Sequence, residues 1–404
     1  MAPDRSTFVR TAWSLSLLFV AGCAGLVTSG CGLIANTSAN SPLPSFSRPQ
    51  TVDIDHTSIK WQTIGNCWAY SHLGWAESLI KKATGESLDF SETYLTYRHF
   101  EEQLLLTSDL NEIQTAGSFE RTVFLLQKYG LLLEGEFIPD ESGVARSLVQ
   151  ARAVERINES LKYGPLKTDR SPLLIRSELN KAFGISDEQF LLRTERVRLP
   201  REIAMGLRSE RPWTLEDDLA SWHEVVWDPD LYHVPSSLPA TAAQLTRSRK
   251  SLLKTVKSAL NQGHPVMINW FVDFAALDEQ GEFTLATLQK NGSGHQGHHS
   301  SVMEDYVVTG NHPETGEPYE TPEGNIDEKL KEWAAEKGRL RYFVIKNSWG
   351  GAERLDRPSY SRFGEKGYAR LDASYLFAWI VDTSFFATPR AVITSFVLPT
   401  EPTQ

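Results

Sequence analysis

The sequence of 404 residues is long enough for about two or three average domains, or for one domain with large insertions. Apolar residues make up 41% of the chain and charged residues 23%, which is typical of a globular protein and excludes a disordered, fibrous or polytopic membrane chain. The net charge of -10 argues against nucleic acid as a partner, because a phosphate backbone is bound mainly by clustered Lys and Arg.

The number and positions of the cysteines limit the roles that they can have in this chain. The three cysteines, Cys23, Cys31 and Cys67, cannot form the disulfide framework of small secreted domains. Two of them lie in the N-terminal segment, so Cys67 is the single thiol of the expected folded domain, residues 51–404. Stability must therefore come from packing, and Cys67 is a candidate for reactivity.

The N-terminus has the features of an export signal. Arg5 and Arg10 precede an apolar run that ends in small residues, as in a secretory signal peptide. The run Val20-Ala21-Gly22-Cys23 resembles the lipobox of bacterial lipoproteins, in which the signal is removed and the cysteine is acylated. This resemblance implies that residues 1–22 are cleaved and that Cys23 carries a lipid. The protein would then be anchored in the bacterial cell envelope, on the periplasmic or outer face of a membrane.

Two other interpretations of this segment stay open. Cys31, which follows a Ser-Gly pair, is a rival lipidation site. The uncharged residues 11–47 could instead hold an uncleaved anchor, since ~20 apolar residues suffice to span a bilayer, although their Gly, Ser and Thr content disfavours it. The Ser and Pro residues over 23–50 predict a flexible tether.

The first strong element is a helix from Cys67 to about Thr84. Apolar residues recur at helical spacing along it, Asn66 is expected as the N-cap, and Gly85 as the stop. Cys67 would lie in the first turn, where the helix dipole and a neighbouring imidazolium lower the pKa of a thiol. On the helix alone, a small buried cysteine without chemistry is the simpler interpretation.

The residues around this cysteine resemble papain-like cysteine peptidases. In that family a Gln precedes a Gly-x-Cys-Trp segment that opens a long helix, and the matching residues are Gln62, Gly65, Cys67 and Trp68. The resemblance implies that Cys67 attacks a peptide carbonyl, while Gln62 and the Cys67 backbone N–H bind the oxyanion. Four residues separate Gln62 from Cys67, one fewer than is usual, and Ile64 replaces a family disulfide cysteine.

Further family-like segments follow in the expected order. Residues 89–95 resemble the next family helix and by themselves predict a capped helix with an acid in its first turn. Residues 116–119, before a helix that ends at Gly130, resemble the family's glycine loop. The resemblance makes Gly117 the residue whose backbone pairs with the substrate, and an ordinary turn is the alternative. Residues 259–268 predict a helix, a turn and a buried strand, like the entry into the right-hand lobe.

A general base is expected at His299. Residues 297–308 begin with histidines and continue into a strand-like run, and a base at the start of a strand across the cleft would be held rigidly beside the thiol. The family pattern has a small residue after the His and a Tyr seven positions on. Counting from His299 gives Ser300 and Tyr306, a better match than counting from His298.

A metal site is the alternative for this segment, because His295, His298 and His299 lie close together in sequence. Zinc sites usually draw ligands from more than one element, and no matching Cys or acid pattern stands out, so we expect no metal and no other cofactor. The pair His223-Glu224 resembles part of a metalloprotease motif, but the second histidine is missing.

The most specific family-like segment is residues 342–350, which ends in Asn-Ser-Trp-Gly, followed by residues 364–371. The resemblance implies that Asn347 accepts the second imidazole N–H and fixes the ring, while Trp349 shields that hydrogen bond from water. Burial strengthens such a bond and stabilises an imidazolium paired with a thiolate.

The resemblance implies a two-lobed α+β fold. The left lobe, about 60–139, would be helical, and the right lobe, about 260–372, would be antiparallel and β-barrel-like. Residues 373–404 are expected as a C-terminal extension.

A large helical insertion is expected at about 140–259. His299 follows Cys67 by far more than the ~130 to 150 residues of papain and cathepsins, so extra chain must lie between them. Helical stretches are predicted near 144–162 and 173–183, and the insertion loosely resembles that of bleomycin hydrolases.

These residues predict a cysteine peptidase that hydrolyses peptide or protein substrates at Cys67, His299 and Asn347 through an acyl-enzyme thioester. Acyl transfer or deamidation by the same thiol is an alternative on this fold. A catalytically inactive papain-like binding protein is an alternative of another class, supported by the shortened spacing of Gln62.

Overall fold

The computed structural model describes residues 54, 57–144, 146–208, 210–227, 249–322, 326–350, 367–383 and 388–400. The expected signal peptide, the tether and Cys23 lie outside the described residues, as do residues 364–366 of the last family-like segment. All described residues belong to one compact unit. No helix among them has the length and hydrophobicity to cross a membrane.

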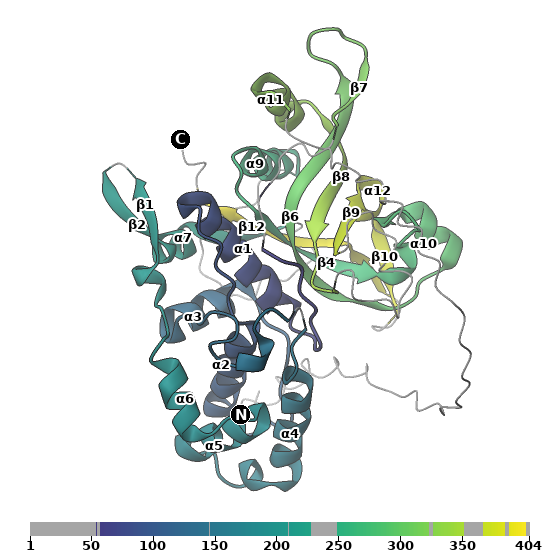
Figure 1. The fold of residues 1–404 in the computed structure, drawn as a ribbon. Coiled ribbons are helices and arrows are strands. Elements are labelled where there is room, and N and C mark those ends of the chain that lie inside the picture. Colours follow the sequence, from purple (N-terminus) through teal and green to yellow (C-terminus); the bar gives the residue numbers. More distant parts are fainter. Residues whose placement is uncertain are drawn as a thin grey trace, which may run out of the picture. The chain divides into compact units, whose positions relative to one another are not determined.

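The described chain has the expected α+β fold, with helices in its first part and a mostly antiparallel sheet in its second part. Three helices come first: α1 (Cys67–Thr84), α2 (Glu92–Leu106) and α3 (Phe119–Tyr129). Helix α1 contacts α2 and α3 on one side and strands of the main sheet on the other (Figure 1). It is therefore buried on almost all faces, as its two apolar faces predict.

Local sequence explains where these helices begin and end. Helix α1 stops at Gly85, which adopts a left-handed conformation with φ of 78° and donates its N–H to Lys81 O at 2.8 Å. The Ser91 hydroxyl caps α2 by accepting from Tyr94 N at 3.2 Å. Helix α3 ends at Gly130, as predicted.

Three helices of the expected insertion pack on α2 through a shared apolar cluster: α4 (Gln150–Tyr163), α5 (Pro172–Phe183) and α6 (Asp187–Thr194). Helix α4 begins later than the predicted residue 144. The Glu141 carboxylate accepts hydrogen bonds from Ser147 Oγ and Leu148 N, which hold the preceding chain in a loop.

The rest of the expected insertion is not purely helical. It forms a hairpin of β1 (Ala204–Arg208) and β2 (Arg211–Thr214), then α7 (Leu215–Ser221) and β3 (Trp222–Val226). Strand β3 pairs with β12 (Ile393–Pro399) and so belongs to the main sheet.

The main sheet has the strand order β3-β12-β4-β6-β8-β9-β5, with β7 paired to β6. Its other strands are β4 (Val266–Asp273), β5 (Glu282–Phe283), β6 (Gln296–Asn311), β7 (Pro318–Glu320), β8 (Arg339–Lys346) and β9 (Tyr368–Asp372). All described pairings are antiparallel except β5 with β9. Within the described residues β3 does not pair with β5, so this mostly antiparallel sheet does not close into a barrel.

Smaller elements surround this sheet. The helices are α9 (Arg249–Asn261), α10 (Leu285–Asn291), α11 (Glu328–Glu336) and α12 (Ala373–Leu376), and a separate hairpin joins β10 (Trp379–Asp382) to β11 (Thr388–Ala391). Short 3₁₀ turns lie at Pro139–Glu141, Pro165–Lys167, Pro200–Glu202 and Phe274–Ala276. The predicted helix, turn and buried strand over 259–268 are the end of α9 and the start of β4.

The C-terminal segment is part of the sheet and not an appendage to it. Strand β12 lies between β3 and β4, and its apolar side chains are almost fully buried. The sheet therefore extends past the boundary expected at Asp372, because the last described strand fills an inner position.

Residues 57–62, which we call the strap, connect the helical part to the sheet. Gly350 N donates to Lys60 O at 3.1 Å, and Gln62 N donates to Ser348 O at 2.9 Å. Near its start, the hydroxyl of Thr57 accepts from Lys346 Nζ at 3.1 Å and donates to Glu77 Oε2 at 2.5 Å. The strap thus contacts α1 and the end of β8 at once.

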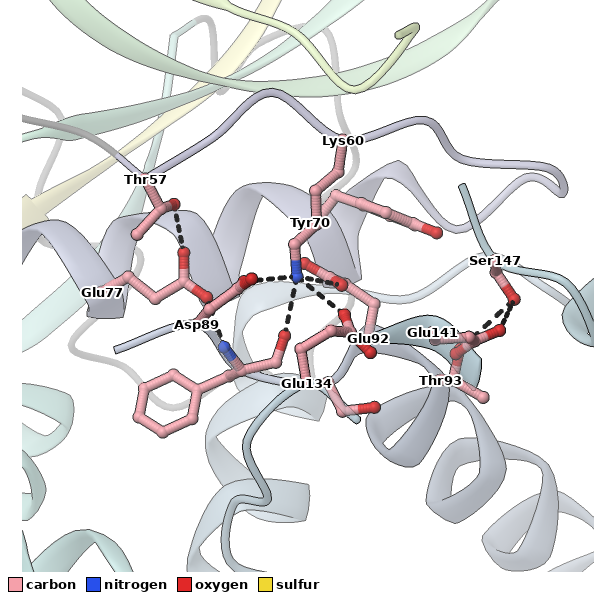
Figure 2. A network of polar contacts seen from close by, with 12 residues as sticks. Thr57, Lys60, Tyr70, Glu77, Asp89, Glu92, Thr93, Glu134, Glu141 and Ser147 are labelled. Carbon is pink, nitrogen blue, oxygen red and sulfur yellow. Dashed lines mark hydrogen bonds and ion pairs between the residues drawn. The ribbon is translucent and has the colours of Figure 1, made fainter. Parts of the chain in front are cut away.

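The buried Lys60 side chain leaves the strap and enters a group of acids, of which Glu92 and Glu134 have buried side chains and Asp89 is partly exposed (Figure 2). Its Nζ lies 2.7 Å from Glu92 Oε2, 2.7 Å from Asp89 Oδ1 and 2.9 Å from Glu134 Oε2. A further bond of 2.9 Å goes to Phe90 O. Burial alone would lower the pKa of Lys60, but the surrounding carboxylates raise it well above its usual value. Lys60 is therefore charged and holds the start of α2 against the strap.

Two buried histidines, on helices α1 and α2, should make the folded protein less stable in acid. Burial lowers the pKa of His72 to about 3, and burial together with Arg121 lowers that of His99 to about 4. Between pH 6.5 and these values the unfolded chain binds protons that the folded chain does not, so stability falls as the pH falls. We expect a loss of about 1.6 kcal/mol per buried histidine between pH 6.5 and 5, measured by urea unfolding.

The His72→Gln variant is the control for this effect. Its unfolding free energy should depend less steeply on pH than that of the parent protein over the same range. Equal slopes in the two proteins would contradict the assignment of the loss to His72.

Candidate active site

Cys67 is the first residue of α1 and is half-buried, as a free thiol. Asn66 precedes it at the N-cap position, but its side chain forms no capping bond. Its Nδ2 donates instead to Thr96 Oγ1 at 2.9 Å and to Gln150 Oε1 at 3.0 Å. The predicted cap position is confirmed and the predicted capping bond is wrong. The amide fixes the chain before Cys67 to α2 and α4.

The thiol lies beside β6, at Ser300. Burial raises the pKa of the Cys67 thiol, and hydrogen bonds from the backbone and hydroxyl of Ser300 and from the backbone of Trp68 offset part of that increase. The expectation of a lowered thiol pKa is therefore corrected. Removal from water outweighs the backbone N–H groups at the start of the helix.

His299 and Asn347 form the hydrogen bond expected of a base and its orienting residue. His299 Nε2 lies 2.8 Å from Asn347 Oδ1, and both side chains are buried, at 5% and 4% exposure. Trp349 stacks on the imidazole with ring centroids 4.4 Å apart and an interplanar angle of 29°. The structure thus brings His299, Asn347 and Trp349 together from two neighbouring strand segments.

The imidazole is neutral in this environment. Burial lowers the pKa of His299 to about 4, and the bond to Asn347 offsets only part of the effect. Because Nε2 is engaged by Asn347, Nδ1 is the nitrogen left to accept a proton. No hydrogen bond joins Cys67 to His299 among the described residues, a looseness that is common in catalytic sites without substrate. The resting pair is a thiol and an uncharged imidazole.

His298 and His299 point to opposite faces of β6, as alternation along a strand requires. His298 Nε2 lies 2.9 Å from Arg390 Nη1, and the His298 ring contacts Phe271. The structure therefore separates His298 from His299. In the part of the chain that the structure describes, no three His, Cys, Asp or Glu side chains are placed to hold a metal ion.

Gln62 lies on the strap, next to the segment that follows Asn347. Its Nε2 donates to Ile64 O at 3.0 Å, and its Oε1 accepts from Ser348 Oγ at 2.6 Å. One amide N–H is thus used within the loop before Cys67, and the second is available for a ligand. The bonds to Ser348 tie the position of Gln62 to that of Asn347.

Gly117 is exposed and lies against Trp68, the residue after the candidate nucleophile. A Cβ atom at Gly117 would come within 2.5 Å of Trp68 Cε2 and 2.6 Å of Cδ2. The Trp68 indole is itself held by a bond of 2.8 Å from Nε1 to Thr115 O. Close packing therefore requires a glycine here, and its backbone stays open to solvent.

Alanine at Gly117 is expected to force Trp68 to move. We expect a stability loss of about 1–3 kcal/mol from the overpacked contact, measured by thermal or urea unfolding. The matched control is Gly297→Ala, because a Cβ there meets no atom within 4 Å and Gly297 is not among the glycines with positive φ. A loss of equal size in both variants would refute the packing explanation for Gly117.

Sequence reasoning missed three polar residues of the site. Ser300 contacts the thiol, Ser301 donates to Asn347 Oδ1 at 2.9 Å, and Trp270 donates from Nε1 to Ser301 Oγ at 3.1 Å. Strand alternation could have placed Ser301 on the face of His299, since the two are two residues apart. The contribution of Trp270 depends on the register of β4 with β6, which no local pattern reveals.

Comparisons with known proteins leave the family open. No protein-family model matches the sequence, and neither does any curated protein. Among solved structures, PepW from Lactobacillus rhamnosis HN001 is 13% identical, with a TM-score of 0.39 over 88% of this chain and 82% of that one.

Two further solved structures are similar at the same level. Xylellain, a cysteine protease from Xylella fastidiosa, is 14% identical with a TM-score of 0.39, over 90% of this chain and 91% of that one. A structure from a study of the mite allergens Blo t 1 and Der p 1 is 13% identical with a TM-score of 0.34, over 90% of this chain and 75% of that one. Similarities of this size carry no conclusion about the chemistry of this chain, which rests on its own residues.

Proposed function

We propose that this chain is a papain-like cysteine peptidase. Cys67 is the nucleophile, His299 the general base, Asn347 its orienting residue, and Trp349 the cover over their hydrogen bond. The Cys67 backbone N–H and the free N–H of Gln62 are the donors for the oxyanion, and Gly117 offers its backbone to the substrate. Peptides or proteins are the substrates, and no cofactor is required.

The reaction begins with proton transfer during attack. His299 Nδ1 takes the thiol proton while Cys67 Sγ forms a bond to the carbonyl carbon. The peptide C–N bond then breaks, and the imidazolium gives its proton to the leaving amine. Water, deprotonated by His299, attacks the thioester, releases the acid and restores the thiol. The neutral resting pair fits this order, in which charge separates only as the bond forms.

One observation carries the proposal. The buried bond between His299 and Asn347, stacked under Trp349, leaves Nδ1 as the only ring nitrogen open to a reacting group. Cys67 contacts Ser300, so the thiol lies beside the strand that carries His299.

Labelling with a thiol-directed peptide epoxide tests the proposal. The folded protein, residues 51–404, should be labelled at Cys67, as shown by mass spectrometry of its peptides. Labelling should fall sharply in the His299→Ala variant and should match a free-thiol rate after denaturation. A folded protein labelled no faster than denatured protein would contradict peptidase chemistry.

A catalytically inactive binding protein is the second candidate. It is favoured by the bond from Gln62 Nε2 to Ile64 O, which uses one of the two N–H groups of the Gln62 amide within the loop. The same labelling experiment separates the two functions, because a binding protein has no need of an accelerated thiol.

We also propose that the mature protein begins at acylated Cys23 and is held on a bacterial membrane. The support is the lipobox-like sequence before Cys23. Several acyl chains anchor firmly, whereas a single chain holds only marginally. Cys23→Ser should move the protein from the membrane to the soluble fraction of the native host, with Cys31→Ser as the control. A mature protein that still begins at Met1 would refute this proposal.

A further inference from the structure

A chain of buried hydrogen bonds continues behind His299. Asn347 Oδ1 accepts from His299 Nε2 at 2.8 Å and also from Ser301 Oγ at 2.9 Å. Ser301 Oγ in turn lies 3.1 Å from Trp270 Nε1. Trp270 and Ser301 are 0% and 1% exposed, so water cannot substitute for either partner.

The four residues are placed by three adjacent strands. Trp270 lies on β4 directly opposite His299 on β6, and Ser301 follows His299 by two residues on the same face. Asn347 comes immediately after β8, which pairs with β6. The sheet therefore fixes the order Trp270, Ser301, Asn347 and His299 without any flexible loop.

The Trp270 indole fixes which group donates and which accepts in this series of hydrogen bonds. An indole N–H can only donate, so Ser301 Oγ must accept from Trp270. The hydroxyl hydrogen of Ser301 is then free to point to Asn347, where it requires an acceptor. That requirement places Oδ1, and not Nδ2, next to Ser301 and His299. His299 must consequently donate from Nε2, which leaves Nδ1 unprotonated in the neutral ring.

The opposite orientation of the Asn347 amide shows why Ser301 matters. Nδ2 is buried without a hydrogen-bond partner among the described residues, so Asn347 has no strong contact of its own on that side. If the amide turned over, Nδ2 would donate to His299 Nε2, and the Ser301 hydroxyl hydrogen would lose its acceptor. A buried donor left without an acceptor is costly. The Ser301 hydroxyl is thus the group that selects one orientation.

We infer that Ser301, held by Trp270, is a positioning residue that sets the tautomer of His299. It acts through Asn347 and does not touch the substrate. With Ser301 in place, Nδ1 can accept the proton of Cys67. In the opposite orientation Nδ1 carries a proton and cannot act as a base. The link to catalysis rests on the proposed peptidase function, but the tautomer itself does not.

The test is nitrogen NMR of histidine-labelled protein, which reports the ring nitrogen that carries the proton. In the parent protein at pH 7, His299 should carry it on Nε2. Ser301→Ala should produce a mixture with protonated Nδ1, and Ser301→Thr, which keeps the hydroxyl, should restore the Nε2–H form. Ser395→Ala is the control, because it removes a buried hydroxyl from β12 that is bonded to Glu224 and Asn269.

Kinetics supply the second measurement. Ser301→Ala should lower kcat on the order of tenfold with little change in KM, because the substrate contacts stay intact. In an Asn347→Ala background the same change should have no further effect, since the two residues act in series. If Ser301→Ala fails to fold, Trp270→Phe takes its place and should also populate protonated Nδ1.

An unchanged Nε2–H tautomer in folded Ser301→Ala, or in Trp270→Phe when the first variant does not fold, would overturn the inference. This outcome is independent of the peptidase proposal. A parent protein whose thiol is never labelled would refute the peptidase while the NMR result still decides the role of Ser301.

Discussion

Alanine at Cys67 or at His299 is expected to reduce peptide hydrolysis by at least about a thousandfold each. Nucleophile and base act as one unit, so removal of either leaves only binding and the oxyanion donors. The double variant should be no slower than the single variants, for the same reason. Initial rates with a fluorogenic peptide, for a protein whose folding is checked by circular dichroism, give the measurement.

The neighbouring histidine provides the control. His298 lies on the other side of β6 and contacts Arg390, so His298→Ala should keep most of the activity. The activity of Asn347→Ala should lie between those of His298→Ala and His299→Ala, because this variant keeps the base but orients it poorly. Full activity in His299→Ala, or its loss in His298→Ala alone, would reverse the assignment of the base.

Replacement of Lys60 by methionine should lower the free energy of unfolding by about 3–5 kcal/mol. The variant keeps a side chain of similar length but leaves Glu92 and Glu134 buried without their cation. It also removes the bond from Lys60 to Phe90 O. Urea unfolding at pH 7 measures the loss.

An exposed ion pair is the matched control for Lys60. Lys254 pairs with Glu336 at 2.6 Å, but the two side chains are 53% and 44% exposed. Lys254→Met should therefore cost at most about 1 kcal/mol. In a Glu92→Gln background the cost of Lys60→Met should shrink, since one of the buried carboxyl groups that pair with Lys60 has gone. An equal cost for the two lysines would show that burial does not decide the strength of these pairs.

Local sequence was sufficient to predict the bounds of the helices near the candidate site. Helical spacing and Gly85 defined α1 to its last residue, and Ser91 defined the start of α2. Family resemblance named His299 and Asn347, and the structure brings their side chains into hydrogen-bond contact. These features depend on a few neighbouring residues, or on a motif, and can be inferred without long-range pairing.

Features that depend on distant residues could not be inferred. Asn66 is a residue type that commonly caps helices, but its amide binds Thr96 and Gln150 on other helices instead. Lys60 gives no local sign that four acidic or carbonyl groups surround it. The raised thiol pKa follows from the burial of Cys67 against β6, and burial is a property of the folded sheet.

The inner position of β12 determines when the main sheet can be completed during synthesis. Strand β3 ends at Val226 and β4 begins at Val266, yet both wait for Ile393–Pro399 before their facing edges are hydrogen-bonded. Cys67 and His299 leave the ribosome, or an export channel, well before that strand does. Because pairing over such a separation is slow and comes late, a growing chain contains Cys67 and His299 before the last strand of the sheet has paired. The sheet that carries His299 is therefore complete only after residue 399 has emerged.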